Sequence, residues 1–154
     1  MVNNDAIYKD VVRYIGELIT VNTLPAGVLC NVMAALQQAL PHYFWVGLYV
    51  VNGNRLELGS FQGPPACAYI HKGKGVCGTA WAEARTIVVP DVEQFAGHIA
   101  CSSLSKSEIV VPVMRDGEVV AVIDVDSREL NAFNATDRHH LEHIAVMLSE
   151  SGLL

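Results

Sequence analysis

The spacing of the hydrophobic residues changes twice along the chain, and this limits the fold more than any other feature of the sequence. In roughly the first forty residues, apolar side chains recur with the period of an amphipathic helix, over two successive segments. From Tyr43 to Val51 they alternate with the period of a strand, and a helical period returns only after Asn134. We therefore predict helices at both ends of the chain and strands between them.

The three predicted helices each carry one apolar stripe. The first is made of Ile7, Val11, Tyr14, Ile15 and Leu18. The second follows Thr23, a plausible N-cap, and carries Val28, Leu29, Val32, Leu36 and Leu40. The last begins near Asn134 and carries Leu141, Ile144, Ala145 and Leu148. These stripes predict that all three helices pack against a shared core.

The strands are predicted to form hairpins. Asn52-Gly53-Asn54 signals a tight turn that returns the chain through 55–61, and Arg115-Asp116-Gly117 joins a strand over 108–114 to one over 118–126. Between the hairpins, 76–84 is a candidate helix and 86–89 a short strand. We predict an α+β fold, with an antiparallel sheet covered by helices on one face. The long segment 63–107 is then free to cover a pocket on the other face.

Composition narrows the class of protein. With 154 residues, 51% of them hydrophobic, the chain is expected to form a single domain over residues 1–154. Its longest apolar stretch, Tyr43–Val51, is too short to span a membrane, and charges interrupt the first twenty residues where a signal peptide would be apolar. We expect a cytoplasmic protein. The net charge is -6 and the basic residues are scattered, so nucleic acid is not an expected partner.

Four cysteines require a chemical explanation. No pair has the short spacing typical of zinc ligands, and without a secretory signal a disulfide framework is disfavoured, which leaves redox or catalytic use. Cys30 lies on the apolar side of the second helix and is interpreted as a small buried hydrophobe. Cys67, Cys77 and Cys101 fall in the loop-rich middle, where redox function is favoured over a structural role. Cys101 follows His98 and opens a run rich in hydroxyl groups, whose hydrogen bonds would lower its thiol pKa.

Acidic residues mark the last hairpin. Val119, Ala121, Ile123 and Val125 are expected to face the core, which places Asp124 and Asp126 together on the opposite face. Glu108 begins the neighbouring strand and could add a third carboxylate, and these acids lie either at a solvated strand end or in a partly dry pocket.

Two other residue types are ambiguous. Trp45, on the first strand, is either a core side chain or an indole surface for a ligand. His139 and His143 lie four residues apart on one helix face, but an exposed helix surface is favoured over a metal site.

Four segments resemble the free methionine-(R)-sulfoxide reductases, single-domain enzymes of the GAF fold. They are Gly59-Ser60-Phe61-Gln62-Gly63, Gly75-Val76-Cys77-Gly78-Thr79-Ala80, Gly97-His98-Ile99-Ala100-Cys101 and Ser107-Glu108-Ile109-Val110-Val111-Pro112. The spacing of Cys67, Cys77 and Cys101 matches as well. The resemblance implies reduction of free L-methionine (R)-S-oxide to L-methionine, with thioredoxin as reductant and no organic cofactor or metal. It also makes a homodimer the candidate assembly.

The resemblance also assigns roles. Cys101 matches the catalytic cysteine, Cys67 the main resolving cysteine, and Cys77 an additional cysteine that can form a disulfide. Residues that match the family's substrate pocket are Trp45, Glu108, Asp124 and Asp126. The alternative function is a GAF sensory module that binds a small ligand or senses oxidants through its cysteines.

Overall fold

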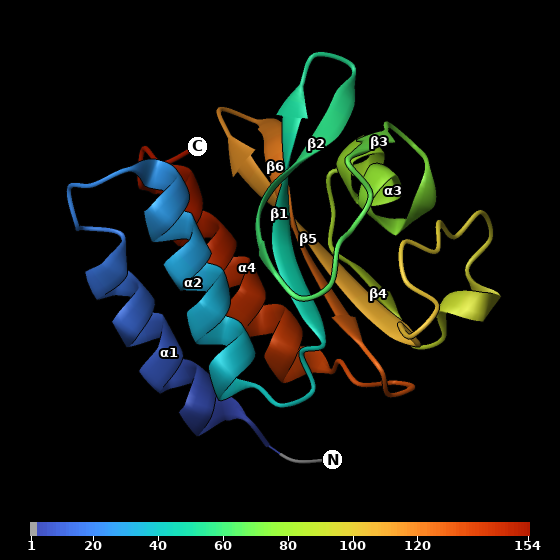
Figure 1. Ribbon diagram of the computed structural model, residues 1–154, viewed down its shortest axis with the longest axis horizontal. Helices are drawn as coiled ribbons and strands as arrows, with labels where there is room; N and C mark the ends of the chain where they lie inside the picture. Colours follow the sequence, from blue (N-terminus) through green and yellow to red (C-terminus); the bar gives the residue numbers. More distant parts are fainter. Residues whose placement is uncertain (1–2) are drawn as a thin grey trace.

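The structure, a computed structural model, describes residues 3–154 and has four α-helices and one antiparallel sheet of six strands in that range (Figure 1). The elements in chain order are α1 (Asp5–Leu18), α2 (Pro25–Ala39), β1 (Trp45–Asn52), β2 (Arg55–Gln62), β3 (Tyr69–His71), α3 (Gly75–Glu83), β4 (Ile87–Val89), the 3-10 helix η1 (Val92–Gln94), β5 (Ser107–Arg115), β6 (Glu118–Ser127) and α4 (Ala135–Glu150). Within the described range, no helix has both the length and the apolar character needed to cross a membrane.

The sheet has the strand order β3-β2-β1-β6-β5-β4, so the two predicted hairpins lie side by side at its centre. Helices α1, α2 and α4 lie on one side of the sheet, and α3 with the long loops lies on the other (Figure 1). The predicted α+β arrangement, with helices on one face and loops over the other, is confirmed.

Two hydrophobic clusters occupy the two faces of the sheet. On β1, Val46 and Leu48 belong to the cluster under the helices, whereas Trp45 and Tyr49 belong to the cluster under α3 and the loops. This is the alternation expected of a strand buried on both faces. The predicted alternation is therefore confirmed from Trp45 onward. It is wrong for Tyr43 and Phe44, which precede β1 and lie on the opposite faces to those predicted.

A bulge changes the alternation in β6. Val113 on β5 pairs with Ala121 and Met114 pairs with Val119, so Val120 has no partner residue there. The extra residue turns Val119 toward the pocket-face cluster and Val120 toward the helices. The prediction that Val119 shares a face with Ala121 is wrong for this reason, whereas Ile123 and Val125 face the helices as predicted.

Polar contacts correct two details of the helices. In α1, Tyr8 is fully buried and its hydroxyl donates a 2.5 Å hydrogen bond to Asp137 of α4, whereas Ile7 and Tyr14 of the predicted stripe are 38% and 52% exposed. Helix α2 begins at Pro25 without a side-chain cap, so the predicted cap at Thr23 is wrong. Asn134 does cap α4, in a capping box with Asp137.

Candidate functional site

The register of the central strands aligns the acidic residues with Trp45. Asp126 on β6 lies opposite Glu108 on β5 and opposite Trp45 on β1. One step along the sheet, Asp124 lies opposite Gly47. All of these side-chain positions point to the loop-covered face, because alternate residues of a strand share a face. The carboxyl groups thus lie in a pocket rather than at a solvated strand end.

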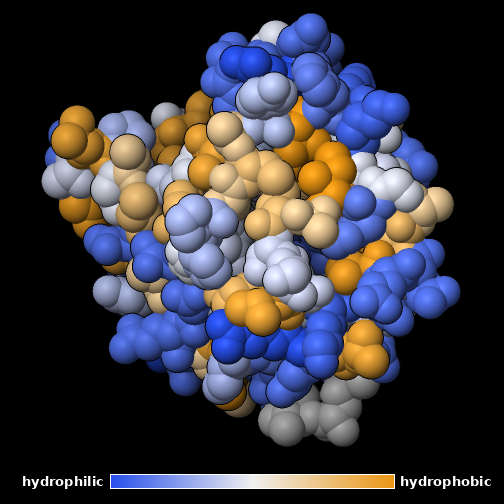
Figure 2. Space-filling view, turned by 45° about the vertical axis from the view of Figure 1, so that its right-hand side comes forward, coloured by the Kyte–Doolittle hydropathy of each residue, from blue (hydrophilic) through white to orange (hydrophobic). Residues whose placement is uncertain are grey.

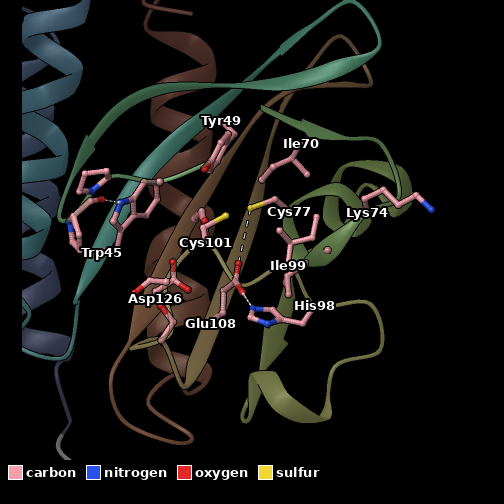
Figure 3. A pocket seen from close by; sticks show the side chains of 18 residues that line it. Trp45, Tyr49, Ile70, Lys74, Cys77, His98, Ile99, Cys101, Glu108 and Asp126 are labelled. Atoms are coloured by element: carbon pink, nitrogen blue, oxygen red, sulfur yellow. Dashed lines mark hydrogen bonds and ion pairs between the residues drawn. The ribbon is translucent and has the colours of Figure 1, made fainter. Parts of the chain in front are cut away.

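This pocket lies between the sheet, the start of α3 and the loops (Figure 3). Six of the seven residues predicted from the sequence line it: Trp45, Cys77, Cys101, Glu108, Asp124 and Asp126. The seventh, Cys67, is joined to the pocket because its sulfur forms a disulfide with that of Cys101, with an S–S distance of 2.01 Å. The histidines of α4, His139 and His143, are exposed on the helical side of the sheet.

The disulfide connects two loops that are far apart in sequence. Cys101 is exposed and Cys67 is half-buried, and the hydroxyl of Tyr49 donates a 2.8 Å hydrogen bond to the Cys67 carbonyl. Tyr49 is itself 1% exposed. The first strand therefore holds the backbone of one partner of the disulfide against the sheet.

Cys77 lies in the first turn of α3 and is a free, buried thiol. Its sulfur donates to Oε1 of Glu108 over 4.0 Å. The helix lies close to β3 because Gly78 has no side chain, since a Cβ there would be 2.4 Å from the His71 carbonyl oxygen. Gly78 thus allows the third cysteine to reach the carboxyl cluster.

Aromatic rings form the wall of the pocket beside β1. The Trp45 indole donates a 3.0 Å hydrogen bond to the Pro64 carbonyl and makes stacking contacts with the rings of Tyr49 and Phe61. Gly47 makes room for this ring, because a Cβ there would lie 2.5 Å from both Trp45 and Phe61. Trp45 is therefore a buried wall of the pocket, so the two interpretations of its role from sequence are compatible.

Burial and mutual repulsion raise the pKa of every acid in the cluster. Burial raises the pKa of Glu108 to about 8, with a further contribution from the charge of Asp126. Burial and the charge of Glu108 raise the pKa of Asp124, and burial and the charge of Asp124 raise that of Asp126. Burial, with the nearby carboxylates, also raises the pKa of the Cys77 thiol. The cluster consequently holds protons at neutral pH that exposed carboxylates would release.

We expect Glu108→Gln to flatten the pH dependence of stability. Between its ordinary pKa of 4.5 and about 8, Glu108 is protonated in the folded state and ionised in the unfolded state. The folded state then binds more protons, so the free energy of unfolding falls as pH rises through this window, by at most about 1.4 kcal/mol per pH unit for one group. Urea unfolding at pH 5 and pH 8 should show a smaller difference for Glu108→Gln than for the wild type.

The control for this measurement is Glu57→Gln. Hydrogen bonds from Asn52 and Arg55 lower the pKa of Glu57, so this surface carboxylate is ionised at both pH values. Its substitution should leave the difference between pH 5 and pH 8 unchanged. Equal differences for Glu108→Gln and the wild type would contradict the raised pKa.

Two further pocket residues, His98 and Tyr49, contact the predicted ones but were not predicted as site residues. The His98 Nε2 lies 3.5 Å from Oε2 of Glu108, and its side chain is 15% exposed. Burial lowers the pKa of His98, which favours the neutral imidazole. Tyr49 was assigned only to the correct face of its strand. The short sequence separation between His98 and Cys101 indicated that His98 lies near the pocket. The contact of His98 with Glu108 could not be predicted, because it depends on how the loop folds over the sheet.

Comparisons with known proteins agree with this geometry. The sequence pattern of the GAF domain matches residues 25–149. The chain is 49% identical to GAF domain-containing protein A of Dictyostelium discoideum, covering 92% of this chain and 89% of that protein. It is 36% identical to the free methionine-R-sulfoxide reductase of Escherichia coli strain K12, covering 96% and 90% respectively.

A solved structure extends the likeness to three dimensions. The X-ray structure of free methionine-R-sulfoxide reductase from Neisseria meningitidis in complex with its substrate has a TM-score of 0.93 and 42% sequence identity, and the match covers 98% of this chain and 91% of that chain. The fold and its loop-covered pocket thus define a GAF-domain protein. Within that class, the chain belongs to the family of free methionine-R-sulfoxide reductases. The resemblance seen in the sequence is confirmed.

Proposed function

We propose that Cys101 is the nucleophile with which this oxidoreductase reduces free L-methionine (R)-S-oxide to L-methionine. The observation that carries this proposal is the disulfide between Cys101 and Cys67 beside a buried cluster of carboxyl groups. A nucleophilic cysteine, a second cysteine able to reach it and a nearby acid are the parts that sulfoxide reduction needs.

The reaction balances in two steps. The Cys101 thiolate attacks the sulfoxide sulfur while an acid protonates the sulfoxide oxygen; the oxygen is transferred to Cys101 as a sulfenic acid, and methionine leaves, reduced by two electrons. The Cys67 thiol then attacks the Cys101 sulfenic acid, forming the disulfide and releasing water. The Cα atoms of Cys67 and Cys101 are 5.6 Å apart in this final state.

The carboxyl groups have two tasks in this proposal. One protonated carboxyl group donates to the sulfoxide oxygen, and Glu108 is suited to this because its pKa of about 8 keeps it protonated at neutral pH. An ionised partner, Asp124 or Asp126, pairs with the substrate ammonium. The rings of Trp45 and Tyr49 offer an apolar surface for the S-methyl group.

Reduction of the disulfide completes the cycle, and we assign this step to thioredoxin. The loops around the disulfide expose apolar side chains close to both cysteines in sequence, namely Tyr69, Ile99 and Leu104. Figure 2 turns this side of the molecule forward and shows apolar surface among hydrophilic side chains. Such a surface fits a protein reductant that must approach an exposed cysteine. Homodimerisation stays a prediction from the family resemblance, and a cytoplasmic location stays a prediction from the sequence.

The purified protein tests the assignment when the two free sulfoxide epimers are supplied separately with dithiothreitol. We expect methionine to form from the R epimer and to remain at the no-enzyme level with the S epimer. A protein that releases no methionine from either epimer would contradict the function.

For Cys67→Ala, the loss of activity should depend on the reductant. Dithiothreitol is small enough to reduce the Cys101 sulfenic acid directly, whereas thioredoxin acts on a protein disulfide. We expect the variant to retain a larger share of wild-type turnover with dithiothreitol than with thioredoxin. Because Cys77 can substitute for Cys67, the same comparison is made with the Cys67→Ala/Cys77→Ala double variant. Equal losses with both reductants would show that Cys67 is not the resolving cysteine.

A further inference from the structure

Cys77 is the pocket cysteine that the disulfide leaves free, and it lies among potential metal ligands. One ligand atom from each of Cys77, Glu108 and Asp124 can be chosen so that all three atoms lie within 4.8 Å of one another. These residues come from α3, β5 and β6, and each is at most 6% exposed. In Figure 3, the labelled Cys77 and Glu108 side chains point toward each other. The sequence separation between cysteines could not reveal such a site, because only one of its ligands is a cysteine.

Asp124 supplies an independent indication that a ligand is bound here. Its Oδ1 atom is buried and has no hydrogen-bond partner within residues 3–154. A buried carboxylate oxygen without a partner is costly, and a cation would satisfy it. Of the residues that line the pocket, Lys74 and His98 are the basic ones. The Lys74 side chain points away from Glu108 and Asp126 in Figure 3, and burial lowers the pKa of His98, which favours its neutral imidazole. Neither side chain therefore supplies a positive charge at the unpartnered oxygen.

The donor types identify the cation. A thiolate with carboxylates suits zinc, whereas magnesium and calcium prefer oxygen ligands alone. The 4.0 Å between the Cys77 sulfur and Oε1 of Glu108 is close to the distance of about 3.5 Å between two ligands of one tetrahedral zinc ion. His98 lies beside this group, with its Nε2 3.5 Å from Oε2 of Glu108, but it is not one of the three residues whose ligand atoms lie within 4.8 Å of one another.

We propose that Cys77, Glu108 and Asp124 bind one zinc ion inside the pocket, with the fourth tetrahedral position open to a solvent molecule. On binding, the Cys77 thiol and the protonated carboxyl groups of Glu108 and Asp124 release their protons to solvent, so that the sulfur coordinates as a thiolate and the oxygens as carboxylates. This site is separate from the disulfide chemistry, since it needs neither Cys101 nor Cys67. It is built from residues that also line the substrate pocket, so the ion and a substrate ammonium exclude each other.

The test uses the oxidised protein, in which Cys67 and Cys101 are in the disulfide and only Cys30 and Cys77 are free thiols. Metal-free protein is titrated with zinc against a chromophoric chelator, without added thiols. We expect one bound equivalent. Cobalt(II) in place of zinc should give a thiolate-to-metal charge-transfer band, which reports sulfur coordination directly. Neither readout depends on turnover, so failure here leaves the proposed function untouched.

Three variants define the ligands. We expect Cys77→Ser to remove the charge-transfer band. We expect Asp124→Asn to lower the zinc affinity by at least roughly tenfold, because even residues that only hydrogen-bond to metal ligands typically lose that much affinity when substituted. Cys30→Ser, which removes the half-buried cysteine of α2, should bind like the wild type. Circular dichroism verifies that each variant is folded. If Cys77→Ser does not fold, Asp124→Asn still tests the site.

Two results with the variants, and one with the wild type, would overturn the proposal. One is zinc binding to folded Cys77→Ser or Asp124→Asn with wild-type affinity. The other is loss of the charge-transfer band in Cys30→Ser, which would place the ion on α2. Absence of a bound equivalent in the wild type would overturn it as well.

Discussion

Replacing Cys101 with serine is expected to lower kcat/KM for free methionine (R)-sulfoxide by at least about a thousandfold, because loss of a nucleophile commonly costs more than that. A hydroxyl group is a far weaker nucleophile toward sulfur at neutral pH than a thiolate. The measurement is methionine released with dithiothreitol as reductant, which bypasses the resolving cysteine. This choice isolates the first chemical step from the formation of the disulfide.

The matched control is Cys30→Ser, in which a cysteine outside the pocket is replaced by the same residue. Its turnover should equal that of the wild type. Residual activity of Cys101→Ser within tenfold of the wild type would move the nucleophile to another residue, and Cys77 would be the first candidate.

The second large effect concerns the free amino group of the substrate. N-acetylated methionine sulfoxide keeps the sulfoxide but not the ammonium, so a carboxylate of the buried cluster loses its charge partner. Removing one partner of a buried ion pair typically costs about 3 to 5 kcal/mol. That is roughly two to four orders of magnitude in kcat/KM at ~1.4 kcal/mol per tenfold.

Two comparisons separate charge from size. The methyl ester of methionine sulfoxide is also larger but keeps its ammonium, and we expect it to retain more activity than the acetylated form. Comparable kcat/KM values for the acetylated and free substrates would show that the carboxylates do not bind the ammonium. If Asp124→Asn and Asp126→Asn both kept KM but lowered kcat, these residues would be better assigned to protonating the sulfoxide oxygen.

Local signals in the sequence predicted most of the sheet. Asp116 and Gly117 both have positive φ in the structure, as expected for the tight turn between β5 and β6. Once the two central hairpins are fixed, alternation along β1 and β6 assigns Trp45, Asp124 and Asp126 to one face. The grouping of the strand residues Trp45, Glu108, Asp124 and Asp126 around one pocket follows from these local rules, whereas Cys77 on α3 and Cys101 on a loop are not placed by them.

The errors arose where distant contacts decide the structure. Tyr8 is buried in place of Tyr14 because Asp137, 129 residues later, accepts its hydrogen bond. The position of Val119 depends on a single bulged residue in β6. Strand β3 has only three residues and was not predicted, since such a short strand depends on its pairing with β2. The contact of His98 with Glu108 depends in the same way on a loop that has no regular period.

The sheet keeps the two hydrophobic clusters apart, with the helices on one face and the pocket on the other. The side chains that hold α1, α2 and α4 in place are thus not the ones that contact a bound molecule. Free-energy effects of substitutions at such separated positions add. Thermal tolerance can therefore be engineered on the helical face while ligand preference is redesigned on the other, and a single GAF scaffold can be adapted to new small molecules without rebuilding its interior.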